Sequence, residues 1–318
     1  MSFYAIKHIT RYTYAEPVID SANQVLLFPV NDEYQEVKKH ELLITQTPSI
    51  EVFTDYFGNQ VGIFSLIKPH KELLIRSLIE VETKEVPVPT DELPVATQWS
   101  MLEEAQFQFP MMDFLIGEKF EALDAVTKEA MAFKTAGSTP FAVAKTLADL
   151  IYTTFTYRKG ITSVETGIDE IWKLKAGVCQ DFAHILLVML RIAGIPARYV
   201  SGYICPKNHE LRGEGATHAW VEAYLPEYGW IGLDPTNNCL VSDRHVRLAI
   251  GRDFSDCTPV KGTYKGSSEH SLEVSVVINN GTEIADEAAE QPVFTYQVNN
   301  PARVDNSYRK FMEMQQQQ

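Results

Sequence analysis

One apolar segment constrains the fold of this chain more than any other. Residues 177–190 read Gly-Val-Cys-Gln-Asp-Phe-Ala-His-Ile-Leu-Leu-Val-Met-Leu, and Gly194-Ile195-Pro196 follows as a helix-stop signal. A helix that is apolar on almost every face is normally buried inside a domain. We therefore predict a buried helix here, with other helices and strands packed around it.

A cysteine stands at the start of this predicted helix. Cys179 faces the unpaired N–H groups of the first turn and the positive end of the helix dipole, an environment that favours a thiolate. Gly177 has no Cβ, so we expect it to let another chain approach the sulfur closely. Asp181 is expected to complement the helix dipole. Cys179 is then either a nucleophile or, like most free cysteines, a small buried hydrophobic residue.

The composition excludes several classes of protein. The chain has 318 residues and a formal net charge of −14, which disfavours binding to nucleic acid and to anionic membrane surfaces. We find no apolar segment of membrane-spanning length, and residues 1–8 lack the pattern of a signal peptide. The four cysteines follow no disulfide-framework spacing, so we expect free thiols and a cytoplasmic location.

The N-terminal part of the sequence is typical of an all-β domain. Residues 1–95 contain short alternating segments separated by turns, which predicts a small β-sandwich-like domain. In one of these strands Ile75, Ile79 and Val81 fall on the same face. Pro87, Pro89 and Pro94 then interrupt the pattern and mark the predicted domain boundary.

The second predicted domain spans residues 96–300 and mixes helices with strands. Ser138-Thr139-Pro140 is a helix cap followed by proline at the first helical position. Strands are expected over 197–204, 217–225 and 230–236, and late strands at 272–278 and 293–298 are assigned to the same domain. Residues 301–318 are predicted to be a polar tail. The fold class is α+β.

Cysteine catalysis needs a base for the thiol proton and a third group that orients the base. His218 lies on one predicted strand, and Asp234 lies on the next strand, just before Pro235. Taken singly, each residue has a structural alternative, as a packed histidine and as a turn aspartate. A four-residue connection would place the two side chains on opposite faces, whereas an odd-length loop or a bulge would bring them together.

Three ordered motifs resemble those of the transglutaminase-like cysteine protease superfamily. They are Gly177-Val178-Cys179-Gln180-Asp181-Phe182-Ala183, Thr217-His218-Ala219-Trp220-Val221-Glu222 and Gly232-Leu233-Asp234-Pro235-Thr236. The opening segment and residues 256–266 further resemble a bacterial subgroup with an N-terminal β-domain. The resemblance implies a papain-like core, with helices packed on an antiparallel sheet or barrel. It also implies that Cys179 is the nucleophile, His218 the general base and acid, and Asp234 the residue that orients His218.

Other residues near these motifs are candidates for substrate contacts. Oxyanion stabilisation needs donors aimed at developing negative charge, and the N–H of Cys179 is one such donor. Gln180 and the Tyr157 hydroxyl are further candidates, although each could instead serve in packing or capping. Trp220 either walls off water from the reacting groups or belongs to the core. We expect no cofactor and no metal, because His184, Cys205 and His209 form no complete zinc ligand set.

These residues predict a thiol-dependent acyl-transfer enzyme that acts on amide bonds of a peptide or protein substrate. Resolution of the thioester by water would give a cysteine peptidase or amidase, which we favour because many bacterial relatives are regarded as peptidases. Resolution by an amine would give a protein-glutamine transglutaminase, but we see no acidic cluster resembling a calcium-binding loop. The alternative from another class is a non-catalytic binding module on the same fold.

Overall fold

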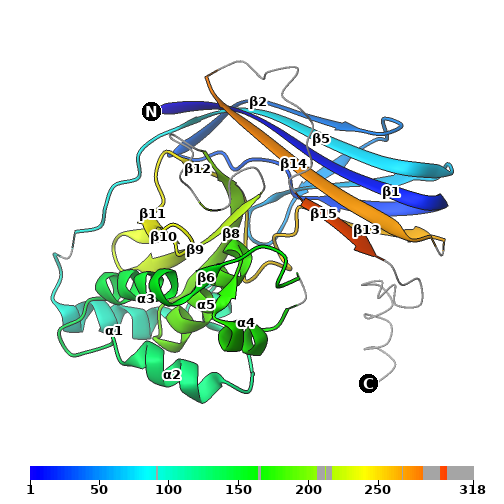
Figure 1. Cartoon of the computed structure of the whole chain (residues 1–318). Helices are drawn as coiled ribbons and strands as arrows, with labels where there is room; N and C mark the ends of the chain where they lie inside the picture. The colour runs from blue at the N-terminus through cyan, green and yellow to red at the C-terminus, as the bar shows by residue number, and fades with distance from the viewer. Residues whose placement is uncertain are drawn as a thin grey trace. The chain divides into compact units, whose positions relative to one another are not determined.

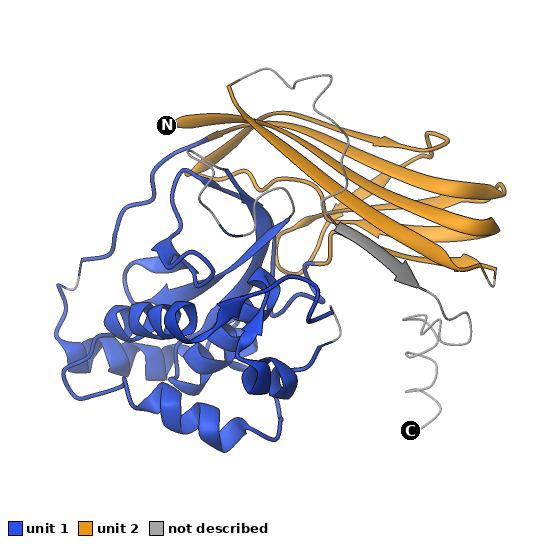
Figure 2. Cartoon of the chain, viewed as in Figure 1, with its two compact units in different colours: residues 1, 83–257 blue, residues 2–82, 258–318 orange. Residues whose placement is uncertain are grey.

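The computed structural model describes residues 1–90, 92–163, 166–205, 212, 217–266 and 268–281, together with the backbone of 294–298. The predicted tail, 301–318, lies outside the described residues. The chain divides into two compact units, one formed by residues 83–257 and Met1, the other by residues 2–82 and 258–318 (Figure 2).

The unit that contains the N-terminal region is a β structure organised on one long strand. Its strands are β1 (Ser2–Val25), β2 (Gln35–Ile44), β3 (Glu51–Thr54), β4 (Gln60–Leu66), β5 (His70–Thr83), β13 (Val260–Lys265), β14 (His270–Asn280) and β15 (Phe294–Val298). β1 pairs with β4, β5, β13 and β14, so it holds most of the sheet together (Figure 1). On β5, Ile75, Ile79 and Val81 are fully buried, which confirms that they share the inner face.

The late strands belong to this β unit and not to the helical unit, so their predicted assignment to residues 96–300 is wrong. β14 runs antiparallel to β1 from Tyr4↔Asn280 to Tyr14↔His270, and β13 pairs with the far end of β1. Alternation in the sequence correctly indicated strands at 272–278 and 293–298, but it carries no information about the partner strand. The two ends of the chain therefore meet in one sheet.

The unit boundary also differs from the predicted one. It falls at Thr83 and not after residue 95. Hydrogen bonds join the segment that follows β5 to the unit formed by residues 83–257. Thr83 Oγ1 donates to the carbonyl of Asp243, and the Tyr228 hydroxyl donates to the carbonyl of Pro87. Pro87, Pro89 and Pro94 therefore lie within the unit formed by residues 83–257, and they do not mark its boundary.

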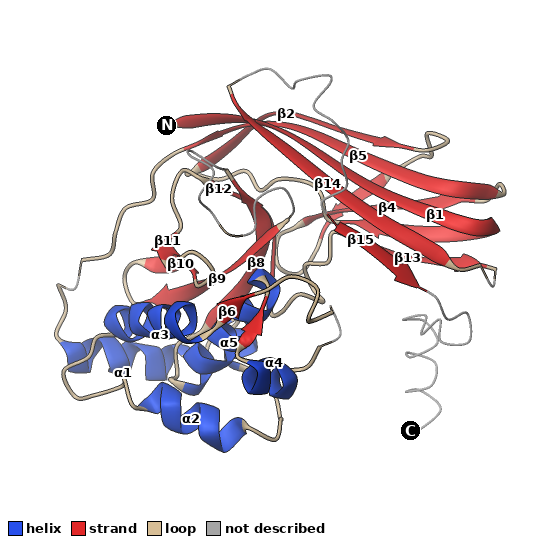
Figure 3. Cartoon of the chain, in the orientation of Figure 1, coloured by secondary structure: helices blue, strands red, loops and turns tan. Residues whose placement is uncertain are grey.

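The second unit combines helices with a five-stranded antiparallel sheet, as the α+β prediction requires (Figure 3). The helices are α1 (Val95–Ala105), the 3-10 helix η1 (Met111–Leu115), α2 (Leu123–Met131), α3 (Pro140–Thr154), α4 (Ile168–Leu174) and α5 (Cys179–Ile192). The sheet runs in the order β11-β10-β9-β8-β12, and its strands are β8 (Ala197–Ile204), β9 (His218–Leu225), β10 (Gly229–Asp234), β11 (Cys239–Leu240) and β12 (His245–Gly251). A short parallel pair, β6 (Thr156–Tyr157) and β7 (Ala176–Gly177), lies before α5.

The predicted buried helix is α5, and it forms the core of this unit. Its residues from Asp181 to Ala183 and from Ile185 to Leu190 are buried, and it packs against β8, β9, α2 and α3. The stop signal works as expected, because Gly194 adopts a left-handed φ of +83° and the Ile195 N–H donates to the carbonyl of Leu190. The cap of α3 is also confirmed, since Thr139 accepts a hydrogen bond from the Ala142 N–H. In the described part of the chain, the helices are all too short or too polar to cross a bilayer.

Candidate active site

Cys179 is the first residue of α5, which places its thiol at the N-terminal end of the buried helix. The preceding residue, Val178, is extended, so the chain turns into the helix at the cysteine itself. The parallel bridge between β6 and β7 pairs Tyr157 with Gly177, and the Arg158 N–H donates to the Gly177 carbonyl at 2.8 Å. The thiol is half-buried, and Tyr157 is held beside it.

Asp181 fixes the turn that presents the thiol. Its Oδ2 accepts hydrogen bonds from the Val178 N–H and the Thr162 hydroxyl, each at 2.7 Å. Burial raises the pKa of Asp181, although both hydrogen bonds act in the opposite direction. A Cβ at Gly177 would lie 2.2 Å from Asp181 Oδ2. The space at Gly177 is therefore filled by this carboxylate, while the approach of another chain to the sulfur stays a prediction.

His218 and Asp234 lie on adjacent strands and form a direct hydrogen bond. His218 Nε2 donates to Asp234 Oδ2 at 2.8 Å, and both side chains are fully buried. The connection between β9 and β10 has three residues, because Gly229 pairs with Leu225. The register carries Asp234 to a position opposite Trp220, two residues along the strand from His218. The odd-length loop thus places the imidazole and the carboxylate on one face.

The Asp234 carboxylate accepts hydrogen bonds on both oxygens. The N–H groups of Thr236 and Asn237 donate to Oδ1 at 2.9 and 3.2 Å, while the Asn237 side-chain amide donates to Oδ2 at 2.8 Å. His245 Nε2 also faces Oδ2, at 3.5 Å. Burial acts to raise the pKa of Asp234, but the two histidines hold it well below its usual range. Asp234 is therefore ionised.

The environment of His218 favours the imidazolium. Burial lowers its pKa, but the Asp234 carboxylate and the nearby Cys179 side chain raise it more, with a net shift to about 10. Because Nε2 is bonded to Asp234, Nδ1 is the nitrogen left for the cysteine. Within the described structure, this buried Nδ1 has no hydrogen-bond partner, and Cys179 is near enough to raise the pKa of the ring. Cys179, His218 and Asp234 thus form a continuous chain of interacting groups.

The three secondary candidates occupy different environments. Gln180 and Tyr157 are half-buried next to the thiol, and Tyr157 also packs edge-on against Phe182, with 6.2 Å between ring centroids. Burial, followed by the charge of Cys179, raises the pKa of Tyr157, so its hydroxyl stays protonated and able to donate. Trp220 is fully buried in a cluster with Val200 and Ile250. It packs against the rings of His218 and His245, which supports a place in the core.

Sequence reasoning missed Asn237, His245 and Tyr199. Asn237 directly follows the third motif, and an asparagine after Asp-Pro-Thr is a signal for a hydrogen-bonded turn. His245 lies 11 residues beyond Asp234, and its contact depends on the curvature of the sheet. Tyr199 is fully buried on β8, where burial and then the charge of Cys179 raise its pKa far above the usual value. No local pattern marks either of the last two residues.

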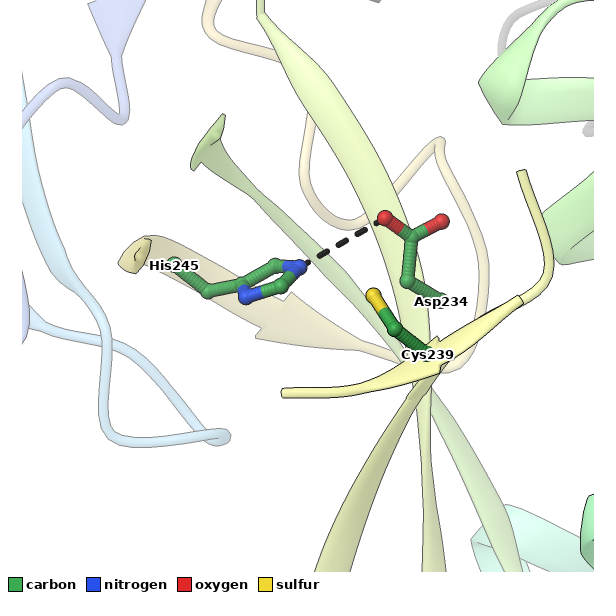
Figure 4. A group of neighbouring side chains, drawn as sticks. All are labelled: Asp234, Cys239 and His245. Carbon is green, nitrogen blue, oxygen red and sulfur yellow. Dashed lines mark hydrogen bonds and ion pairs between the residues drawn. The ribbon is translucent and has the colours of Figure 1, made fainter. Parts of the chain in front are cut away.

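Three side chains at Asp234 are of metal-binding types. One ligand atom each from Asp234, Cys239 and His245 lies within 4.8 Å of the others, and the three side chains converge in Figure 4. One observation disfavours a metal there, because Asp234 Oδ2 already accepts hydrogen bonds from His218 and Asn237.

A cavity of about 420 Å³ lies between α3 and the β10–β11 turn. Its lining includes Lys145, Asp149, Leu233, Asn238 and Cys239, whereas neither Cys179 nor His218 contributes to it. The cavity is therefore on the Cys239 side of Asp234 and does not open onto the thiol.

Comparison with known proteins agrees with this arrangement. The profile of the transglutaminase-like superfamily matches residues 129–235, a range that contains Cys179, His218 and Asp234. The profile of the bacterial transglutaminase-like N-terminal region matches residues 4–82. An uncharacterized protein of Mycobacterium tuberculosis is 33% identical over 287 residues, which cover 86% of this chain and 91% of the relative. The chain belongs to the transglutaminase-like superfamily.

Two further relatives bear on the superfamily assignment. The solved structure of a candidate cysteine protease from Cytophaga hutchinsonii superposes with a TM-score of 0.67 at 22% identity, covering 89% of this chain and 92% of that one. This likeness confirms the transglutaminase-like fold. A protein-glutamine gamma-glutamyltransferase of Pseudomonas aeruginosa is 37% identical over 87 residues, which cover 26% of this chain and 13% of that protein.

The contact between Gly177 and Asp181 gives a testable prediction. Gly177→Ala should displace Asp181 from the Val178 N–H and lower the free energy of unfolding by about 2 kcal/mol, as expected for a lost cap with local crowding. Urea denaturation measures the change. Gly137→Ala is the matched control, because a Cβ there meets nothing within 4 Å and should change stability little. Equal effects of the two substitutions would contradict the role assigned to Asp181.

Proposed function

We propose that this chain is a cysteine peptidase or amidase that cleaves amide bonds of a peptide or protein through a thioester. The observation that supports it best is the buried His218–Asp234 hydrogen bond of 2.8 Å, which lies near Cys179. Of these three residues, Cys179 alone is partly exposed. Such an arrangement matches the roles of nucleophile, base and orienting carboxylate in thiol catalysis. Membership of the superfamily supports the same reaction class.

In the proposed reaction, the Cys179 thiolate attacks the amide carbonyl carbon and forms a tetrahedral oxyanion. The C–N bond then breaks, and the departing nitrogen takes a proton from the His218 imidazolium. The neutral His218 removes a proton from water, which attacks the thioester; collapse of the second tetrahedral intermediate breaks the C–S bond, releases the carboxylic acid and restores the Cys179 thiolate beside the His218 imidazolium. Asp234 keeps the imidazole in one tautomer and stabilises its charged form throughout.

The oxyanion needs donors close to the sulfur. The N–H groups in the first turn of a helix have no intrahelical partner, so we assign the N–H of Cys179 as one donor. The Gln180 amide and the Tyr157 hydroxyl, both half-buried at the thiol, are proposed as the second. Trp220 is not included, because its side chain is fully buried.

Two other properties are part of this proposal. The cysteines at 179, 205, 239 and 257 are all free thiols, which suits a reducing compartment, so we propose a cytoplasmic location that cell fractionation would test. Recovery of the protein from the periplasm would contradict it. A non-catalytic binding module is the competing function, and the reactivity of Cys179 separates the two.

The first test measures thiol labelling. Iodoacetamide at neutral pH should alkylate Cys179 at least about tenfold faster than the same residue in the unfolded chain, because an imidazolium next to the sulfur favours the thiolate. Peptide mass spectrometry gives the rate at each cysteine. Cys205 and Cys257 are buried, and burial raises the pKa of the Cys239 thiol to about 12 although the residue is exposed, so all three should react more slowly than Cys179. His218→Ala should remove the advantage of Cys179. Equal labelling of Cys179 and Cys239 in the native protein would favour the binding module.

The second test distinguishes hydrolysis from transfer. A peptide library incubated with the protein should yield cleaved products that are absent with the Cys179→Ala variant. A labelled primary amine added to the same reaction should be incorporated less often than water. Incorporation of the amine in excess of cleavage would show a transglutaminase, with the same nucleophile and base but a different acceptor.

A further inference from the structure

A second buried histidine, His245, faces the same Asp234 oxygen as His218. It is the first residue of β12 at one edge of the sheet, whereas Asp234 ends β10 near the other edge. The curvature of the sheet brings the two together, with 3.5 Å between His245 Nε2 and Asp234 Oδ2. The same oxygen accepts from His218 at 2.8 Å, so one carboxylate oxygen lies between two imidazoles.

The local backbone fixes which nitrogen of His245 carries the proton. The Ser242 N–H points at His245 Nδ1 at 3.3 Å, and a backbone N–H can only donate. Nδ1 is then the acceptor, and Nε2 carries the hydrogen that points at Asp234. The turn is closed a second time by the His245 N–H, which donates to the Ser242 carbonyl at 3.1 Å. Burial lowers the pKa of His245, so this ring is a neutral donor beside the charged His218.

Packing holds His245 in this orientation. The Trp220 ring meets it edge-on, with 5.2 Å between centroids, and Trp220 also lies 6.3 Å from the His218 ring. Trp220 can lie there because residue 202 is glycine. A Cβ at Gly202 would lie 2.5 Å from the indole ring. The His245 side chain is 2% exposed, so it cannot reorient into solvent. A buried donor of fixed tautomer is thus aimed at the carboxylate that orients the base.

We propose that His245 is a positioning residue of the active site, which fixes the Asp234 carboxylate by donating from Nε2 and so keeps His218 directed at Cys179. This role rests on the proposed function. His245 touches neither the sulfur nor the substrate in the proposed mechanism, and it acts through Asp234 alone. A neutral donor suits this position, because a second cation next to Asp234 would compete with the imidazolium of His218 for the same negative charge.

The test compares three variants by the rate at which iodoacetamide alkylates Cys179 at neutral pH. His245→Leu removes the donor and should slow alkylation about tenfold, the size expected for a lost hydrogen bond to a charged group. His245→Gln keeps an N–H donor of similar reach and should recover the rate to within about threefold of wild type. His184→Leu is the matched control and should leave the rate nearly unchanged. His184 is a half-buried histidine of α5, and its Nε2 accepts from the Phe254 N–H and not from Asp234.

Several results would overturn the role of His245. A folded His245→Leu variant that reacts as fast as wild type would do so, and so would a His245→Gln variant as slow as His245→Leu. A third would be an equal loss of rate in Cys239→Ser or after EDTA treatment, which would mean that a metal shared with Cys239 holds Asp234. Circular dichroism verifies that each variant is folded. A wild-type Cys179 no faster than in the unfolded chain would instead overturn the proposed function.

Discussion

The structure of the helical unit depends on one buried charge, the carboxylate of Asp234. An ionised group out of contact with water is strongly destabilising unless it is paired and hydrogen-bonded. Asp234 meets this requirement with two backbone N–H groups, one side-chain amide and two imidazoles. Three segments must therefore meet at Asp234, namely the turn after β10, the start of β9 and the start of β12. The geometry of the proposed active site follows from satisfying that charge.

A second constraint places the sulfur opposite the imidazole. α5 is buried along most of its length, so its position is set by packing against the sheet and not by the cysteine. The thiol lies near His218 because Cys179 is the first residue of that helix, and Asp181 holds the turn before it through the Val178 N–H. Gly177 is required for that contact, since a side chain there would occupy the place of the carboxylate. The core and the proposed active site are thus built from the same element.

Much of this could be predicted from local sequence, and the failures share one cause. The buried helix, its stop at Gly194 and the cap at Thr139 were correct because each depends on residues a few positions apart. Whether His218 and Asp234 share a face depends on the length of one loop, which the sequence left open. The three-residue connection in the structure places them on the same face. The pairing of β14 with β1 and the contact of His245 with Asp234 join segments through the curvature and order of whole sheets. No pattern of residue types encodes such contacts.

The central claim is that Asp234 keeps His218 protonated beside Cys179, and the most direct measurement is a nitrogen NMR titration of the His218 ring. In the wild-type protein the imidazolium should persist through neutral pH and lose its proton only near pH 10, because a raised pKa keeps the charged form as the pH rises. In Asp234→Asn the ring should be neutral at neutral pH, since burial then acts on it without the carboxylate. A wild-type ring that is already neutral at neutral pH would contradict the claim.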